Sequence, residues 1–214
     1  MRFVTNFMPL LRAATTKPPH FSRSVSILGA GSETAGFDFN DVDLKNSYSA
    51  LKCANHTVIM NDFMTEEFAK REPGTTFIHS SPGIVTTTSL YRELPLWGRV
   101  GLKILTPLFY PFTVGLEETG QRQLYIATSG VFPPLDSSKA STASGVSISN
   151  DQVISKGPND SSGGGAYLAH WKGYAIGNTK NLNYYREKGL GKTAWDHTMA
   201  VFARVEKDAR KAAD

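Results

Sequence analysis

Short apolar runs alternate with a long helical stretch early in the sequence, and this alternation restricts the fold most. Residues 24–28 (SVSIL) and 75–79 (TTFIH) are rich in β-branched residues and run into turns that contain glycine, so they predict strands. Between them, residues 48–71 predict a long helix, with Asn46 and Ser47 as candidate N-caps and a Pro-Gly pair as its end. A strand, a long helix and a second strand predict a right-handed parallel crossover.

A second helical stretch and a third apolar run extend this pattern. Residues 97–118 predict a helix that prolines interrupt, and residues 123–127 (QLYIA) predict a third strand. We therefore predict an α/β domain with a β-α-β-α-β core over residues 1–130, in which helices cover a parallel sheet. The apolar second crossover has two interpretations, which stay open: a helix packed on the sheet, or a lid over an apolar substrate.

The rest of the chain predicts a loop, a hairpin and a helix. Residues 131–170 are assigned to a flexible loop, because most of this range is rich in Ser, Gly, Asn and Asp. Residues 171–214 are assigned to a hairpin, within YLAHWKGYAIG, and a final helix. That helix has an apolar face formed by Trp195, Met199, Phe202 and Val205.

Composition fits one packed domain over residues 1–214. Hydrophobic residues make up 40% of the chain and aromatic residues 11%, which suits a globular core. The net charge is +4 and the basic residues are scattered among acids, so no nucleic-acid partner is predicted. No apolar run approaches the ~18 residues of a membrane span, so no membrane partner is predicted.

Cys53 is the only cysteine, which excludes an intramolecular disulfide and a cysteine-based zinc site. The histidines have no ligand spacing, so no metal is predicted. A single cysteine fits a reducing compartment, and we predict a cytoplasmic protein.

The N-terminal sequence MRFVTNFMPLLRAATTK has two interpretations. Its basic residues and lack of acids are typical of a mitochondrial presequence. The rival interpretation is an amphipathic core helix, which we favour. Its apolar residues recur at helical spacing, at Phe3, Phe7, Leu10 and Leu11.

Tyr48 and Lys52 are the candidate catalytic pair. At a spacing of four residues they would lie on one helix face, a turn apart. A phenol ordinarily titrates near ~10, and a nearby ammonium favours the phenolate and lowers that pKa. Such a phenol can exchange a proton with an alkoxide or an alcohol. The spacing alone also fits an ordinary surface pair.

The sequence downstream of this pair strengthens it. YSALKCANHTVIMNDFMTEEFAKREPGTTFIHSSPGIVTT resembles the short-chain dehydrogenase/reductase family, in which a Tyr-x-x-x-Lys helix precedes a strand and a Pro-Gly-x-Val-x-Thr element. SVSILGAG, GQRQLYIATSG, WKGYAIGN and WDHTMAVFARVEK also resemble fungal members, many of which serve secondary-metabolite pathways. The resemblance thus covers nearly the whole chain.

The resemblance implies a role for each matching residue. Tyr48 would be the general acid/base, and Lys52 would hold the nicotinamide ribose. Gly83, Val85 and Thr87 would face the nicotinamide, so these five residues form the expected cofactor-binding set. The implied cofactor is NADP or NAD, with NADP slightly favoured, and no metal. The implied reaction interconverts a ketone and a secondary alcohol on a small-molecule substrate.

Three features depart from the family pattern. The glycine-rich turn that seats the pyrophosphate is absent, since GAGSETAG at residues 29–36 follows the wrong strand. Gly29 stands where the catalytic serine is expected, and Ser32 is the nearest substitute. The family's active-helix asparagine would precede Met1.

The resemblance therefore implies an incomplete, truncated Rossmann-like doubly wound parallel sheet with later strands only, and the strand at residues 24–28 would be an exposed edge. A longer form or another chain would complete it. The resemblance also implies a homo-oligomer, formed through helices like that at residues 48–71. Two alternatives to the oxidoreductase stay open. One is a cofactor-free remnant that acts as a partner subunit or as an isomerase or cyclase. The other is an interaction protein without an active site.

Overall fold

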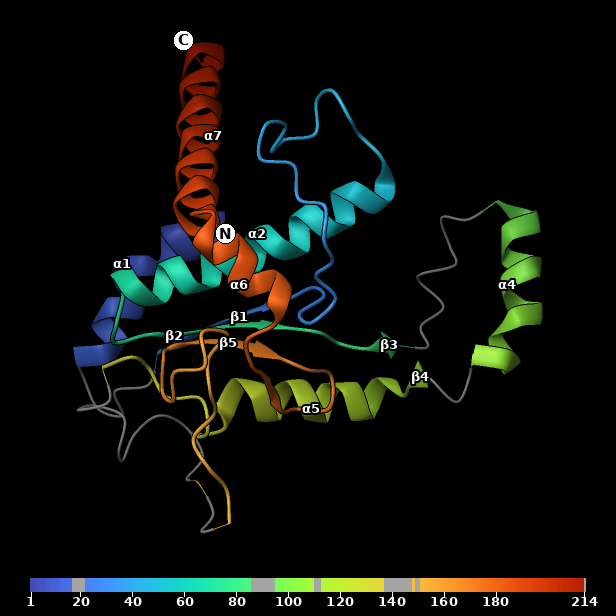
Figure 1. Ribbon diagram of the computed structural model, residues 1–214, viewed down its shortest axis with the longest axis horizontal. Coiled ribbons are helices and arrows are strands. Elements are labelled where there is room, and N and C mark those ends of the chain that lie inside the picture. The colour runs from blue at the N-terminus through green and yellow to red at the C-terminus, as the bar shows by residue number, and fades with distance from the viewer. Residues whose placement is uncertain (17–21, 86–94, 110–112, 137–147, 149–150, 214) are drawn as a thin grey trace.

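A four-stranded sheet with the order β1-β2-β5-β6 forms the centre of the molecule (Figure 1). Strands β1 (Arg23–Ile27), β2 (Thr76–Ser80) and β5 (Ala166–Ala169) run parallel, and the short β6 (Ala175–Ile176) pairs antiparallel with β5. The structure, a computed structural model, describes residues 1–16, 22–85, 95–109, 113–136, 148 and 151–213.

Helices cover both faces of this sheet. α1 (Arg2–Thr16), α2 (Ala50–Arg71), α6 (Lys180–Glu187) and α7 (Leu190–Ala213) pack on one face, and α5 (Leu116–Thr128) lies across the other (Figure 1). Parallel strands between two helical layers are the Rossmann-like α/β arrangement that the sequence predicts. The predicted fold class is therefore confirmed.

Strand β2 is buried on both faces, and its alternating side chains divide the core in two. Phe77 packs with the buried side chains of α2, whereas Ile78 packs in the cluster on the α5 side. His79 bonds to an aspartate of α2, and Ser80 Oγ donates a hydrogen bond to a glutamine of α5 over 2.6 Å. The alternation thus assigns His79 to the α2 face.

Helix α2 begins two residues later than the sequence predicts. Its N-cap is Ser49, whose Oγ accepts a hydrogen bond from the backbone N–H three residues later, over 3.2 Å. The predicted caps Asn46 and Ser47 are wrong, because their backbone N–H groups donate to the carboxylate of Asp41 (3.0 and 2.8 Å). The end of the helix agrees with the prediction.

The predicted third strand at residues 123–127 is wrong, because these residues belong to α5. The buried residues of α5 are Thr119 and Ile126, seven positions apart, which is a helical spacing and not an alternation. The third strand is β5, which lies inside the range 131–170 that the sequence assigns to a loop. All four residues of β5 are buried.

The predicted helix at residues 97–118 is divided into α4 (Leu96–Phe109), β4 (Thr113–Val114) and the start of α5. β4 pairs in parallel with β3 (Ile84–Val85) in a separate two-stranded sheet. α4 stands apart from the four-stranded sheet, so its interpretation as a helix packed on that sheet is wrong (Figure 1). Trp97 on α4 is 80% exposed, and the lid interpretation stays a prediction.

The predicted helices at both ends of the chain are confirmed as α1 and α7. In α1, Met8 and Leu11 contact the core, whereas the rest of the predicted apolar face, formed by Phe3, Phe7 and Leu10, is 78%, 52% and 66% exposed. The predicted hairpin is also confirmed, by the antiparallel pairing of β5 and β6. Among the described residues, no helix has the length and apolar character needed to span a bilayer.

Arg23 connects β1 to the carboxyl end of α5. Its guanidinium donates hydrogen bonds to the carbonyl oxygens of Ile126 (3.0 Å), Ser129 (3.0 Å) and Phe132 (2.7 Å). The last carbonyls of a helix have no partner within it, so Arg23 satisfies the carbonyls of Ile126 and Ser129 at the end of α5. The carbonyl of Phe132 also accepts from Thr76 Oγ1 over 3.1 Å. Burial lowers the pKa of Arg23 to about 10, at which it still carries its charge near neutral pH.

We expect Arg23→Met to lower the free energy of unfolding by about 2–4 kcal/mol, because three buried carbonyls lose a charged donor. Lys192→Met is the control: its side chain is 83% exposed, and surface changes of this kind usually shift stability by about 0.5 kcal/mol or less. Urea unfolding followed by circular dichroism measures both. Equal losses in the two variants would contradict the capping role.

Candidate active site

The predicted site residues that the structure describes lie on the side of the sheet where the parallel strands end. β1 and β2 are parallel, so the residues that follow them, Gly29 and Gly83, lie at the same edge. The crossover helix α2 returns antiparallel to the strands, so its amino end, with Tyr48 and Lys52, lies at this edge as well. Figure 1 shows the start of α2 and the start of β3 on that side of the molecule. Ligands of open α/β sheets bind at this edge.

Tyr48 and Lys52 do not share a helix face as the sequence predicts. Tyr48 precedes the N-cap Ser49, because α2 starts at Ala50. Tyr48 is 71% exposed, and Lys52 is exposed in the first turn. Neither side chain has a hydrogen-bond partner among the described residues. Both groups are therefore free to meet a ligand.

The turn after β2 holds the other expected residues. Gly83 has φ +76°, a left-handed conformation that a residue with a side chain rarely adopts. A Cβ at this position would lie 3.2 Å from Cβ and Cγ of Trp171, so the turn also packs tightly on the β5–β6 hairpin. Val85 pairs with Val114 of β4. Thr87 lies outside the described residues, and its role stays a prediction.

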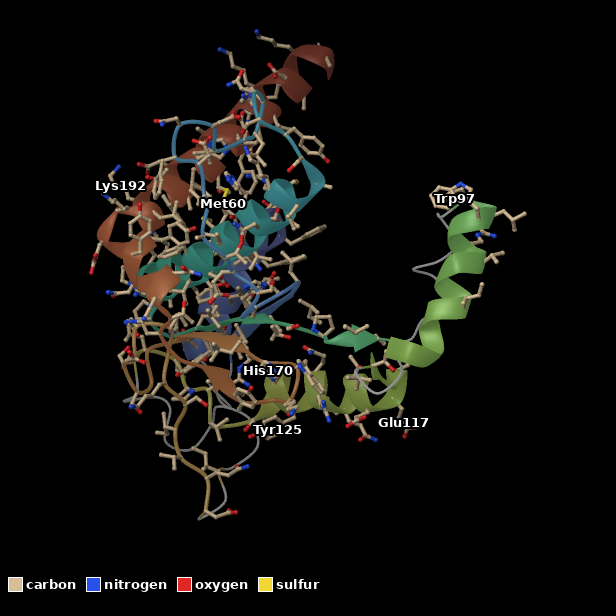
Figure 2. All side chains as sticks on the ribbon, turned by 45° about the vertical axis from the view of Figure 1, so that its right-hand side comes forward. Met60, Trp97, Glu117, Tyr125, His170 and Lys192 are labelled. Carbon is tan, nitrogen blue, oxygen red and sulfur yellow. The ribbon has the colours of Figure 1, made fainter. Side chains whose placement is uncertain are left out.

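The hairpin at this edge carries aromatic and basic side chains. The Arg122 guanidinium lies over the ring of Trp171, 4.8 Å from its centroid, and the ring of His170 stacks on Tyr174 at 4.5 Å. Burial, with help from the nearby Lys172 and Arg122 charges, lowers the pKa of His170. Figure 2 shows His170 at the end of β5, whereas Trp97 stands far away on α4.

The loop after β1 is packed along the first half of α2. The backbone N–H of Thr34 donates to Oδ1 of Asn55 over 2.9 Å. A Cβ at Gly29 would lie 3.1 Å from Oγ of Ser32 and 3.2 Å from Cγ2 of Val58, so the expected position of the catalytic serine is tightly packed. Ser32 Oγ donates to the carbonyl of Gly29 over 2.6 Å. Its predicted role as a substitute stays a prediction.

A buried Asp-His pair lies under this loop, and sequence reasoning missed it. His79 Nδ1 and Asp62 Oδ1 are 2.5 Å apart, and both side chains have no exposed surface. Burial lowers the pKa of His79 to about 4. Burial also raises the pKa of Asp62 well above its usual range, and the nearby Glu33 and Glu66 charges add to this rise. Both shifts favour the uncharged forms.

Glu33 and Glu66 connect this region to the C-terminal helices. Glu66 forms a 2.7 Å ion pair with Arg186 of α6, and Glu33 Oε1 accepts a hydrogen bond from Thr179 over 3.3 Å. Asp62 Oδ2 and Glu33 Oε2 are buried and have no hydrogen-bond partner among the described residues. The described residues contain no group of three or more His, Cys, Asp or Glu side chains suited to a metal ion.

Proteins of similar sequence are oxidoreductases of fungi, and no family model matches the chain. Oxidoreductase AN1596 of Emericella nidulans is 34% identical over 94% of this chain and 58% of its own length. Oxidoreductase andH of Emericella variicolor is 31% identical over 99% and 60%. The short-chain dehydrogenase/reductase SAT2 of Stachybotrys chartarum is 26% identical over 97% and 56%.

Among solved structures, an NADPH-bound carbonyl reductase from chicken fatty liver matches with a TM-score of 0.39 and 13% identity, over 81% of this chain and 50% of that one. The sequence matches confirm the predicted resemblance, because the relatives are named oxidoreductases and one is named a short-chain dehydrogenase/reductase. The chain spans 56–60% of the length of these relatives.

The pKa of His79 makes stability depend on pH. The pKa of His79 is about 4 in the folded chain, whereas its ordinary value is 6.5. Between these two pH values, His79 is protonated in the unfolded chain and neutral in the folded chain. The contribution of His79 is therefore fully present above pH ~6.5 and is lost as the pH falls towards ~4.

We expect the stability difference between the wild type and His79→Gln to grow by roughly 3 kcal/mol between pH ~4 and pH ~7, because glutamine does not titrate. Urea unfolding at several pH values measures this difference. A difference that stays constant with pH would show that His79 is not held neutral by burial.

Proposed function

We propose that this chain carries the proton-transfer site of a cytoplasmic, NAD(P)-dependent short-chain dehydrogenase/reductase. The reaction interconverts a ketone and a secondary alcohol on a small molecule of fungal secondary metabolism. The observation that carries the proposal is the placement of Tyr48 and Lys52 at the same sheet edge as the Gly83 turn. The oxidoreductase names of the fungal relatives support it.

The residues at this edge fit the nicotinamide end of the cofactor. Tyr48 and Lys52 are exposed and have no partners among the described residues, so no existing bond must break when a ligand arrives. The left-handed conformation of Gly83 turns the chain into β3, so the backbone between Gly83 and Val85 lies at the same edge. Residues 29–36 form a loop packed on α2 and do not open a helix, so they offer no seat for the pyrophosphate.

Tyr48 acts as the general acid in the direction of reduction. Its hydroxyl gives a proton to the substrate oxygen as the carbonyl carbon becomes an alcohol carbon, and takes a proton back in the reverse reaction. Lys52 places a positive charge at the same end of α2, where it would bind the sugar of the cofactor. The bound nicotinamide supplies or accepts the hydride.

Tyr48→Phe removes only the hydroxyl, and we expect it to lower kcat/KM for ketone reduction by about 10²–10⁴-fold. Tyr184→Phe is the matched control, because Tyr184 is also exposed (52%) but lies on α6, and it should keep wild-type activity. Consumption of NADPH with a panel of ketones measures both variants. Full turnover by Tyr48→Phe would reject the assignment.

A polypeptide that completes the sheet is the second part of the proposal. β1 pairs only with β2 among the described strands, so its other edge is open. Apolar side chains of α1 flank that edge in a groove lined by Met1, Phe3, Val4, Phe7, Leu11, Arg23, Ser24, Val25 and Ser26. An open edge beside exposed apolar residues suits strand addition. The occupant we propose is the segment that the longer relatives have beyond the matched region.

We expect that segment of Oxidoreductase AN1596, expressed as a separate polypeptide, to bind this chain. Phe3→Glu with Phe7→Glu should abolish binding with little loss of stability, because these side chains are 78% and 52% exposed. Titration calorimetry measures binding, and light scattering measures mass. A doubled mass of the chain alone, lost in the double variant, would instead assign the edge to a homodimer.

A further inference from the structure

A buried hydrogen-bond chain connects α2, β2 and the loop after β1. Asp62 of α2 lies 2.5 Å from Nδ1 of His79, and the backbone N–H of Gly29 donates to Nε2 of the same imidazole over 3.1 Å. The two side chains are fully buried. Water therefore cannot replace either bond without opening the core.

The bond from Gly29 determines which nitrogen of His79 carries the proton. A ring nitrogen that accepts from a backbone N–H is itself unprotonated, so the single proton of the neutral imidazole lies on Nδ1. Nδ1–H then donates to Asp62 Oδ1. By accepting from Nδ1–H, Asp62 stabilises the same tautomer, in which Nε2 can accept from Gly29. Carboxylates behind metal-binding histidines orient the imidazole ring in the same way. Burial, which lowers the pKa of His79 to about 4, keeps the imidazole neutral over the physiological range.

The backbone of Gly29 is held on three sides. His79 binds its N–H, and both the Oγ and the backbone N–H of Ser32 donate to its carbonyl, over 2.6 and 3.1 Å. A Cβ at Gly29 would lie 3.2 Å from Cγ2 of Val58 of α2, so this side of the residue is tightly packed. This loop lies at the ligand edge of the sheet, packed on the helix whose amino end presents Tyr48 and Lys52.

We propose that Asp62 and His79 are positioning residues that fix the loop from Gly29 to Ser32 as the substrate-side wall of the site. This inference rests on the proposed function and deepens it, because it names the element that aligns the substrate carbonyl with Tyr48. The pair acts through the loop and does not touch the substrate. Loss of the pair releases the loop, so the substrate carbonyl is aligned with Tyr48 less often and the reaction rate falls.

Two variants of His79 separate its two bonds. His79→Gln places an amide oxygen near the position of Nε2, so the acceptor for Gly29 remains. His79→Asn places an amide nitrogen near the position of Nδ1, so the donor to Asp62 remains and Gly29 loses its acceptor. A role in packing alone predicts similar behaviour of the two, whereas positioning predicts that only His79→Asn releases the loop.

Amide hydrogen exchange measured by NMR tests this without any activity assay. We expect the Gly29 amide to exchange at least 100-fold faster in His79→Asn than in the wild type, and to stay within 10-fold in His79→Gln. Protection lost equally in both variants, or in proportion to their global stability, would overturn the proposal. The measured kcat should then fall in His79→Asn more than in His79→Gln, with the dissociation constant of NADPH unchanged.

The tautomer provides a test that needs no variant and so survives any folding defect. Nitrogen-15 NMR of labelled histidine should place the His79 proton on Nδ1 in the wild type. A wild-type proton on Nε2 would overturn the proposal. If the tautomer and the exchange protection are found but Tyr48→Phe retains full turnover, the anchored loop stands and the proposed function falls.

Discussion

The burial of β2 on both faces is the constraint on which the rest of the structure depends. A strand between two helical layers must place alternate side chains in different cores, so Phe77 and His79 face α2 while Ile78 and Ser80 face α5. A fully buried histidine on the α2 face needs a hydrogen-bond partner for each ring nitrogen. Asp62 of α2 and the backbone N–H of Gly29, in the loop after β1, are these partners. The same strand delivers the Gly83 turn to the ligand edge.

The parallel crossover converts this packing into a site. Because β1 and β2 are parallel, α2 must return along the sheet, and its amino end meets the ends of both strands. Tyr48, Lys52 and the loop at Gly29 therefore lie on the same side of the sheet, although no bond joins the two candidate catalytic side chains. The buried pair beneath them stabilises the loop, while the exposed side chains remain free for ligands.

Local patterns predicted part of this arrangement, and tertiary contacts decided the rest. Two strands and α2 were predictable because apolar runs and a Pro-Gly stop lie within the segments themselves, although the N-cap of α2 was misplaced. Residues 123–127 were misassigned as a strand because a run of five mostly apolar residues fits both the helical and the strand period. Only the burial of Thr119 together with Ile126 identifies a helix. β5 is four buried residues within a polar region, which no local pattern marks. The Asp62–His79 bond joins two elements 17 residues apart and depends wholly on packing.

The central claim is that the nicotinamide meets this chain at the amino end of α2 and the turn after β2. The most direct measurement is an NMR titration of NADPH into the chain together with the segment that completes its sheet, followed through intermolecular nuclear Overhauser effects. The account predicts contacts from the nicotinamide protons to the Tyr48 ring and the Val85 methyl groups. Nicotinamide contacts confined to other residues would contradict it.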